Sequence, residues 1–163
     1  MYSIRLEGDT RRLLKTIKNF SEINKKKINV AIGEAMREST LERFKQGKDP
    51  TGKSWKASIR AAAEGGKTLV KTSQLRNSIR TKSDGSGFAV GTNVKYAATH
   101  QFGAQGRTIR AKKAPYLRFK VGDQWSSVKK VKISIPARPY LGLSDEDMQE
   151  IKATVEDFIV KED

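Results

Sequence analysis

The segment with the clearest chemical pattern is the glycine-rich run GKDPTGKS at residues 47–54. It satisfies the spacing of a phosphate-binding P-loop, in which Lys53 would contact phosphates and Ser54 would hold a magnesium ion. A P-loop follows a buried hydrophobic strand and opens a helix whose amides face the phosphates. Here the preceding residues 41–46 are charged and have a helical pattern. This context argues against nucleotide hydrolysis.

His100 is the only histidine, and the chain has no cysteine. A catalytic histidine needs an orienting carboxylate and a nucleophile, but the nearest acids in sequence are Asp84 and Asp123. A helical interpretation of residues 96–103 places Tyr96 and His100 on one face. A hydrogen-bonded structural or interface histidine is therefore favoured. Because disulfides, thiolate chemistry and sites rich in Cys or His are excluded, we expect no enzyme, no cofactor and no metal.

A strongly basic stretch runs from residue 107 to 135, with nine cationic residues opposed by Asp123 alone. Three aromatic residues, Tyr116, Phe119 and Trp125, are interleaved with the charges. Such a stretch can bind a nucleic-acid backbone, since cations neutralise phosphates and rings stack on bases. It can equally be an ordinary amphipathic hairpin, and both can hold. The candidate anion contacts are Arg107, Arg110, Lys112, Lys113, Lys129, Lys130 and Lys132.

Charge is unevenly distributed along the 163 residues, whose net charge is +15. From Ser144 to the end there are 8 acidic and 2 basic residues, so the preceding part carries a net charge of +21. This polarity fits nucleic acid or the acidic face of a neighbouring subunit, while a merely solvated basic surface remains an alternative. No apolar run approaches the roughly 18 residues that span a bilayer, and residues 1–5 lack a signal-like stretch, so we expect a cytoplasmic site of synthesis.

Length and periodicity predict one domain over residues 1–163, with a basic hairpin at 107–135 that could protrude from it. The predicted fold is α+β, a small antiparallel sheet packed by a long N-terminal helical region and a C-terminal helix. The long helical region carries Arg37 and Arg43 on a face interpreted as solvated. The expected helical elements are stretches at 13–20 and 28–44, a short helix at 59–64, a turn at 74–79 capped by Thr72 or Ser73, and a final helix after Ser144 with a near capping box. The expected strands are one at 2–7, a hairpin joining 79–81 to 88–90, and strands 116–121 and 128–135 joined near 122–123.

Four sequence blocks carry a resemblance to a known family: PTGKSW at 50–55, LVKTSQLRNSI at 69–79, VGTNVKYAATHQFG at 90–103 and IPARPYLGLS at 135–144. In this order and spacing they resemble the virion-morphogenesis or tail-completion proteins of Mu-like and related contractile-tailed phages. One departure is Thr72-Ser73, where the family usually has a glycine. That departure concerns the local turn.

The resemblance implies a non-enzymatic structural subunit of the virion, made in the host bacterial cytoplasm, that completes the tail or joins it to the head. It implies a homo-oligomeric ring, for which six copies are expected although the sequence does not fix the number, with DNA in the lumen and other neck and tail proteins as partners. The rival interpretation is a basic nucleic-acid-binding module. The resemblance also implies that the segment matching a P-loop is a structural loop that ends in Trp55. The structural or interface candidates are Trp55, Leu75, Tyr96, His100, Phe102, Arg138 and Pro139.

Overall fold

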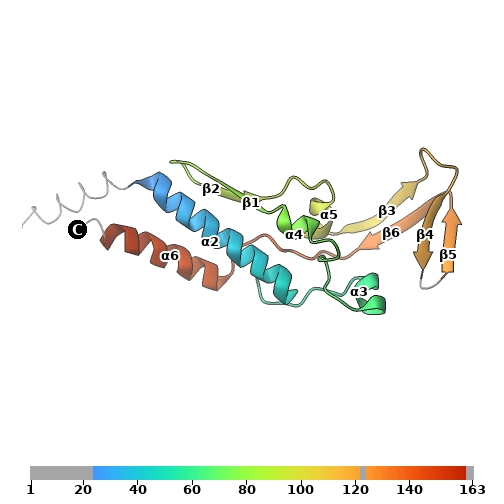
Figure 1. Ribbon diagram of the computed structural model, residues 1–163, viewed down its shortest axis with the longest axis horizontal. Helices are drawn as coiled ribbons and strands as arrows, with labels where there is room; N and C mark the ends of the chain where they lie inside the picture. The colour runs from blue at the N-terminus through green and yellow to red at the C-terminus, as the bar shows by residue number, and fades with distance from the viewer. Residues whose placement is uncertain (1–23, 122–123, 161–163) are drawn as a thin grey trace, which may run out of the picture.

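The computed structural model describes residues 24–121 and 124–160, and the strand and first helix expected before residue 24 lie outside this range. The described chain is elongated (Figure 1). Helices α2 (Lys25–Gln46) and α6 (Asp145–Val160) run antiparallel beside each other at one end, and an arm of four strands projects from the other. The architecture confirms the α+β prediction, with three separate two-stranded antiparallel sheets in the described part of the chain.

Helix α2 confirms the helical prediction for residues 28–44. The side chain of Asn24 caps its start by accepting from the Lys27 amide at 3.1 Å. Its buried residues Ile28, Ile32 and Met36 recur every four positions, so they line one face. That face packs against apolar residues of α6, namely Ile151, Val155 and Phe158, and against Val90.

Helix α6 begins with the reciprocal cap that the sequence predicts. The Ser144 amide donates to Asp147 Oδ2 at 2.8 Å, and the Asp147 amide donates to Ser144 Oγ at 3.1 Å. Two amides left free at the helix start are thereby satisfied. Three acids in the first turn, Asp145, Glu146 and Asp147, also complement the positive end of the helix dipole.

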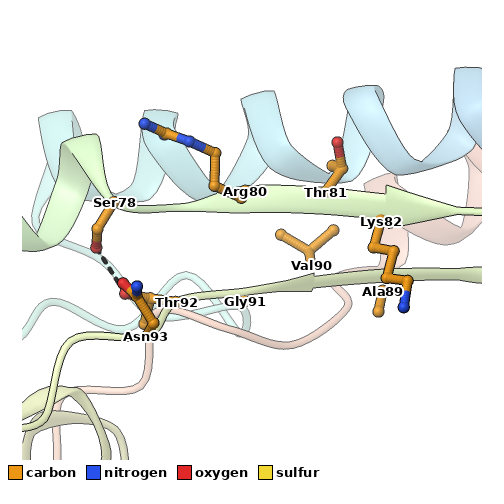
Figure 2. A pocket seen from close by; sticks show the side chains of 9 residues that line it. All are labelled: Ser78, Arg80, Thr81, Lys82, Ala89, Val90, Gly91, Thr92 and Asn93. Atoms are coloured by element: carbon orange, nitrogen blue, oxygen red, sulfur yellow. Dashed lines mark hydrogen bonds between the residues drawn. The ribbon is translucent and has the colours of Figure 1, made fainter.

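The predicted first hairpin is present as β1 (Arg80–Ser83) and β2 (Phe88–Gly91). Its turn is closed by Asp84, whose Oδ1 accepts from the Ser86 amide at 2.7 Å. The hairpin lies along α2, where Gly33 allows close approach: a Cβ there would lie 2.8 Å from Ser83 Oγ. An open groove of about 680 Å³ follows the hairpin, from Ser78 and Arg80 to Thr92 and Asn93 (Figure 2).

Three short helices complete the body: α3 (Ile59–Glu64), α4 (Gln74–Asn77) and α5 (Ala97–Phe102). The first and the third confirm the helical predictions for their segments. At α4 the expected cap is found only as a long hydrogen bond to Thr72 and is wrong for Ser73. Ser73 precedes the helix with φ 56° and makes no side-chain capping bond, and the Gln74 amide reaches Thr72 Oγ1 only at 3.5 Å. Ser73 is one of the two residues, Thr72-Ser73, that depart from the glycine implied by the resemblance, and its left-handed conformation is one that glycine adopts without strain.

The arm consists of β3 (Ala104–Arg110), β4 (Leu117–Val121), β5 (Gln124–Val128) and β6 (Lys130–Ile135). The predicted pairing of residues 116–121 with 128–135 is wrong. β4 pairs with β5, placing Lys120 opposite Trp125, whereas β6 pairs with β3, placing Arg107 opposite Ile133. Only residues 122–123 separate β4 from β5, so residues 124–128 pair directly with β4 as a strand of their own. β6 must then find its partner earlier in the chain.

Candidate functional site

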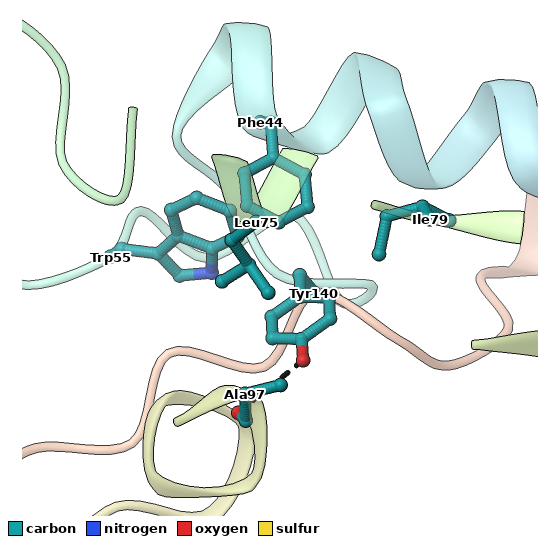
Figure 3. Close-up of a cluster of buried hydrophobic side chains, with 6 residues drawn as sticks. All are labelled: Phe44, Trp55, Leu75, Ile79, Ala97 and Tyr140. Atoms are coloured by element: carbon teal, nitrogen blue, oxygen red, sulfur yellow. Dashed lines mark hydrogen bonds between the residues drawn. The ribbon is translucent and has the colours of Figure 1, made fainter. Parts of the chain in front are cut away.

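The body is centred on six buried residues that come from α2, the following loop, α4, the residue just before β1, α5 and the segment before α6 (Figure 3). Tyr140 and Phe44 are 1% and 0% exposed, and their ring centroids lie 5.1 Å apart. Trp55 meets Phe44 edge-to-face with centroids 5.5 Å apart. Contacts of this kind add to the free energy gained by burial. We call this group the central cluster: Phe44, Trp55, Leu75, Ile79, Ala97 and Tyr140.

The P-loop-like segment forms a tight self-closed loop beside the central cluster. Asp49 Oδ1 accepts from the Thr51 amide at 2.9 Å, from the Thr51 hydroxyl at 2.7 Å and from the Lys53 amide at 3.0 Å. These bonds lower the pKa of Asp49, the Thr51 hydroxyl contributing most. A helix precedes the loop and none opens directly after it, so a phosphate cradle is missing. The amides of Thr51, Gly52 and Lys53 already donate to Asp49.

Trp55 ends this loop and joins it to the segment before α6. Its amide donates to Gly47 O at 2.7 Å, and its indole Nε1 donates to Pro139 O at 2.8 Å. Next to it, Arg138 is 5% exposed and donates through Nε to Lys56 O at 2.7 Å and through Nη2 to Ala57 O at 3.3 Å. Both side chains therefore satisfy backbone carbonyls on the facing segment, which fixes the two segments to each other.

Helix α5 is held to the same segment through Gln101. Gln101 Oε1 accepts from the Tyr140 and Leu141 amides at 3.0 and 3.1 Å, and its Nε2 donates to Leu141 O at 2.9 Å. The Tyr140 hydroxyl donates to Ala97 O at 3.3 Å. The Arg138 amide donates to His100 O at 2.7 Å. The Gln101 side chain thus provides the backbone of residues 140–141 with hydrogen bonds that a neighbouring strand would provide in a sheet.

His100 lies at the end of α5 beside Tyr96, with ring centroids 5.7 Å apart. Its Nδ1 is buried and has no hydrogen-bond partner among the described residues. Burial, and secondarily the charge of Arg138, lower the pKa of His100. The neutral imidazole is therefore favoured. No ion pair joins the ring to a carboxylate in the described part of the chain, and no cluster of three His, Cys, Asp or Glu residues there could hold a metal ion.

The third tie joins α2 to α6 through Arg43, which is 7% exposed, so its interpretation as a solvated residue is wrong. Arg43 pairs with the buried Asp147 and donates to Tyr140 O at 3.1 Å and Gly142 O at 2.8 Å. Burial alone would raise the pKa of Asp147. Hydrogen bonds from Ser39 and Ser144 and the charge of Arg43 outweigh burial and lower that pKa.

The other predicted residues lie in different places. Leu75 is in the central cluster, Tyr96 donates to Gln74 Oε1 at 3.2 Å from a partly exposed position, and Phe102 is 79% exposed. The seven candidate anion contacts are all exposed on the arm, where Arg107 lies close enough to the body to donate to Thr99 Oγ1 of α5 at 3.5 Å. The structure thus brings Trp55, Leu75, Arg138 and Pro139 together and leaves Phe102 and the arm cations on the surface.

Sequence reasoning missed Arg43 and Gln101, and it predicted the capping role of Asp147 but not its ion pair with Arg43. One signal was available for Asp147, because a capping acid at the third position of a helix is held near the chain. The sequence contained no such signal for Arg43 or Gln101. Arg43 sits among other cations on α2, and its two carbonyl acceptors are about 100 residues away in sequence.

The arrangement of these described residues is one of mutual structural ties. The model of the phage virion morphogenesis family matches residues 7–159. The chain belongs to this family. A relative is the Mu-like prophage FluMu G protein 2 of Haemophilus influenzae, which is 31% identical over 128 residues, covering 78% of this chain and 73% of that protein. No solved structure matches the chain.

Membership confirms the resemblance seen in the four sequence blocks and gives the chain a role in virion morphogenesis, in association with the phage particle. The described helices include none that is long and apolar enough to cross a membrane. The central cluster and its ties, from Arg43 to Asp147, lie within the matched region. They are therefore the structural framework of this family member.

Proposed function

We propose that this virion morphogenesis protein is a non-enzymatic subunit of a homo-oligomeric ring that completes the tail or joins it to the head, with DNA passing through the lumen. The supporting observation is the division of the chain into a tied body and an arm. Buried Arg43 and Arg138 satisfy backbone carbonyls within the body, whereas no described residue of the arm from 104 to 135 is buried. A body tied in this way keeps its shape, and an arm without a buried core has exposed surface that can contact neighbouring subunits.

Mass measurement of the purified protein tests the ring. A ring subunit is expected to give one discrete multimer without DNA, and electron microscopy should show particles with a central opening. The same measurement with added neck and tail proteins covers a ring that assembles only on its neighbours. A monomer under both conditions contradicts the proposal.

A genetic experiment tests the place of action. In the encoding phage, loss of the gene is expected to leave heads and tails unjoined or tails with unfinished ends, and mass spectrometry should detect the protein in wild-type virions. Normal infectious particles without the gene contradict a structural role.

The second candidate function is a basic nucleic-acid-binding module, favoured by one feature of the arm. Trp125 is 63% exposed, and the Arg118 guanidinium lies 5.0 Å from its ring centroid. Exposed rings beside cations suit stacking on bases. Such a module would stay small and bind DNA with an affinity that falls steeply with salt.

A further inference from the structure

The arm, residues 104–135, has the properties of a surface that is completed by a partner. It consists of two two-stranded sheets, and a two-stranded hairpin alone is only marginally stable in water. It nevertheless exposes large apolar side chains: Ile109 is 38%, Tyr116 51% and Trp125 63% exposed. These side chains gain free energy only if another surface covers them.

The charge of the arm determines which surfaces can cover it. Its sequence carries nine cationic residues and one acid, Asp123. Removing so many cations from water against a neutral surface is costly, whereas an anionic surface compensates for the lost hydration. The partner of the arm must therefore combine negative charge with apolar contact area.

The body offers a surface of this composition between α2 and α6. A groove of about 640 Å³ is lined by Glu38 and Glu42 from α2 and by Glu146 and Glu150 from α6, all of them exposed. Its apolar lining is formed by the half-buried Ala35 and Leu41, with the buried Met36 beneath them. The only cation of the described lining, Lys45, already pairs with Glu42 at 2.8 Å. Acidic charge therefore remains in excess.

The two complementary surfaces are far apart in one copy. Figure 1 shows the arm projecting away from the paired helices α2 and α6, with its outer sheet β4–β5 at the end of the molecule. An arm therefore meets the groove of another copy rather than its own. A contact between two different patches is heterologous, and repeating it closes a ring when the rotation between copies allows.

We propose that the basic arm of one copy docks in the acidic groove between α2 and α6 of the next copy. This inference rests on the proposed ring and names the surfaces that join its subunits. Duplex DNA, the other anionic partner, would leave the acidic groove unmatched and offers no equivalent of its apolar lining. A second copy accounts for both surfaces at once.

Charge reversal tests the contact in both directions. The arm-reversed variant carries Lys112→Glu, Lys113→Glu and Lys130→Glu, and the groove-reversed variant carries Glu38→Lys, Glu42→Lys and Glu150→Lys. Either variant alone places like charges against each other, so the dissociation constant of the multimer is expected to rise at least tenfold. Mass photometry over a concentration series measures this constant. A matched control reverses three exposed cations at the start of α2, Lys25→Glu, Lys26→Glu and Lys27→Glu, and should assemble like the wild type.

Mixing the two reversed variants in equal amounts is the decisive step. Each reversed arm then faces an oppositely charged groove, so alternating copies are expected to reassemble. Circular dichroism and melting curves confirm that each variant is folded. Loss of assembly in both variants without recovery on mixing would overturn the proposed contact.

The remaining outcomes separate this inference from the proposed function. A wild-type multimer that neither reversal weakens overturns the arm–groove contact and leaves the ring standing. A wild type that never assembles, with or without its neighbours, overturns both. An arm-reversed variant that assembles normally but loses binding to duplex DNA assigns the arm to DNA and also overturns the contact.

Discussion

Arg43 and Asp147 are 104 residues apart in sequence and form a buried ion pair between the end of α2 and the first turn of α6. The other terminal nitrogen of the guanidinium, Nη1, donates to the carbonyls of Tyr140 and Gly142. One side chain thus fixes both the start of α6 and the segment that leads into it. A buried charge stabilises a fold only while its partners are present.

Asp147→Ala is accordingly expected to destabilise the protein by about 3–5 kcal/mol, because it leaves the Arg43 charge buried without its carboxylate and also removes the cap of Ser144. The matched control is Gln149→Ala, an exposed position on the same helix, which should change the free energy of unfolding by less than about 0.5 kcal/mol. Urea unfolding gives both values. Equal free energies of unfolding for the Asp147→Ala and Gln149→Ala variants would show that the ion pair does not hold the helices together.

Gly103 supports a second prediction, because it has φ 76° and ψ 178°, a backbone conformation that is essentially restricted to glycine. A Cβ at this position would lie 2.8 Å from Ala137 N and 2.9 Å from Ile135 O, both backbone atoms. Gly103→Ala should therefore cost at least the roughly 1–3 kcal/mol of backbone strain. Gly91→Ala, with nothing within 4 Å of the added carbon, is the control. A Gly103→Ala variant as stable as the wild type would contradict the described packing of α5 on the segment before α6.

His100 provides a prediction for mild acid. Burial, followed by the charge of Arg138, lowers its pKa below the usual 6.5, so the folded protein binds a proton less readily than the unfolded chain. The stability contributed by the neutral ring is complete above pH 6.5 and is lost as the pH falls through the lowered value. Melting temperatures measured from pH 7.5 to 5 should fall more for the wild type than for His100→Gln. Parallel curves would mean that His100 titrates normally.

The long helices and the first hairpin could be predicted because their signals are local. The spacing of Ile28, Ile32 and Met36 and the cap between Ser144 and Asp147 each lie within a few turns of chain. The arm pairing could not be predicted, because β5 is serine-rich and β6 takes its partner from β3 across the whole of β4 and β5. Register between distant strands depends on tertiary pairing that periodicity does not encode.

The same limit applied to the central cluster and its ties. Trp55 could be singled out through the family loop, but its acceptor, Pro139 O, is 84 residues away. Arg43 and Asp147 looked like surface charges because charged residues are rarely buried without a partner, and the partner lay beyond local reach. Gln101 was indistinguishable from any polar residue on a short helix until the Tyr140 and Leu141 amides were placed against it.

The last prediction separates the phosphate-binding and structural interpretations of residues 47–55, which assign importance to different side chains. In a P-loop, Lys53 contacts phosphate and its loss abolishes nucleotide binding. In the described loop Lys53 hydrogen-bonds through its backbone: its amide donates to Asp49 Oδ1 and its carbonyl accepts from the Asp49 amide, and an alanine keeps both groups. Lys53→Ala should therefore change stability by less than about 0.5 kcal/mol.

Trp55→Ala should have the opposite effect. It removes an indole that is 9% exposed and packs on Phe44, and it leaves the Pro139 carbonyl without its donor, so we expect a loss of about 3–5 kcal/mol and impaired assembly. Trp55→Phe keeps much of the ring contact and should cost less, since only the indole N–H and part of the buried area are lost. Calorimetry with ATP and magnesium should detect no binding to the wild type. Binding of ATP that disappears in Lys53→Ala would restore the nucleotide interpretation, whatever the stability of the tryptophan variants.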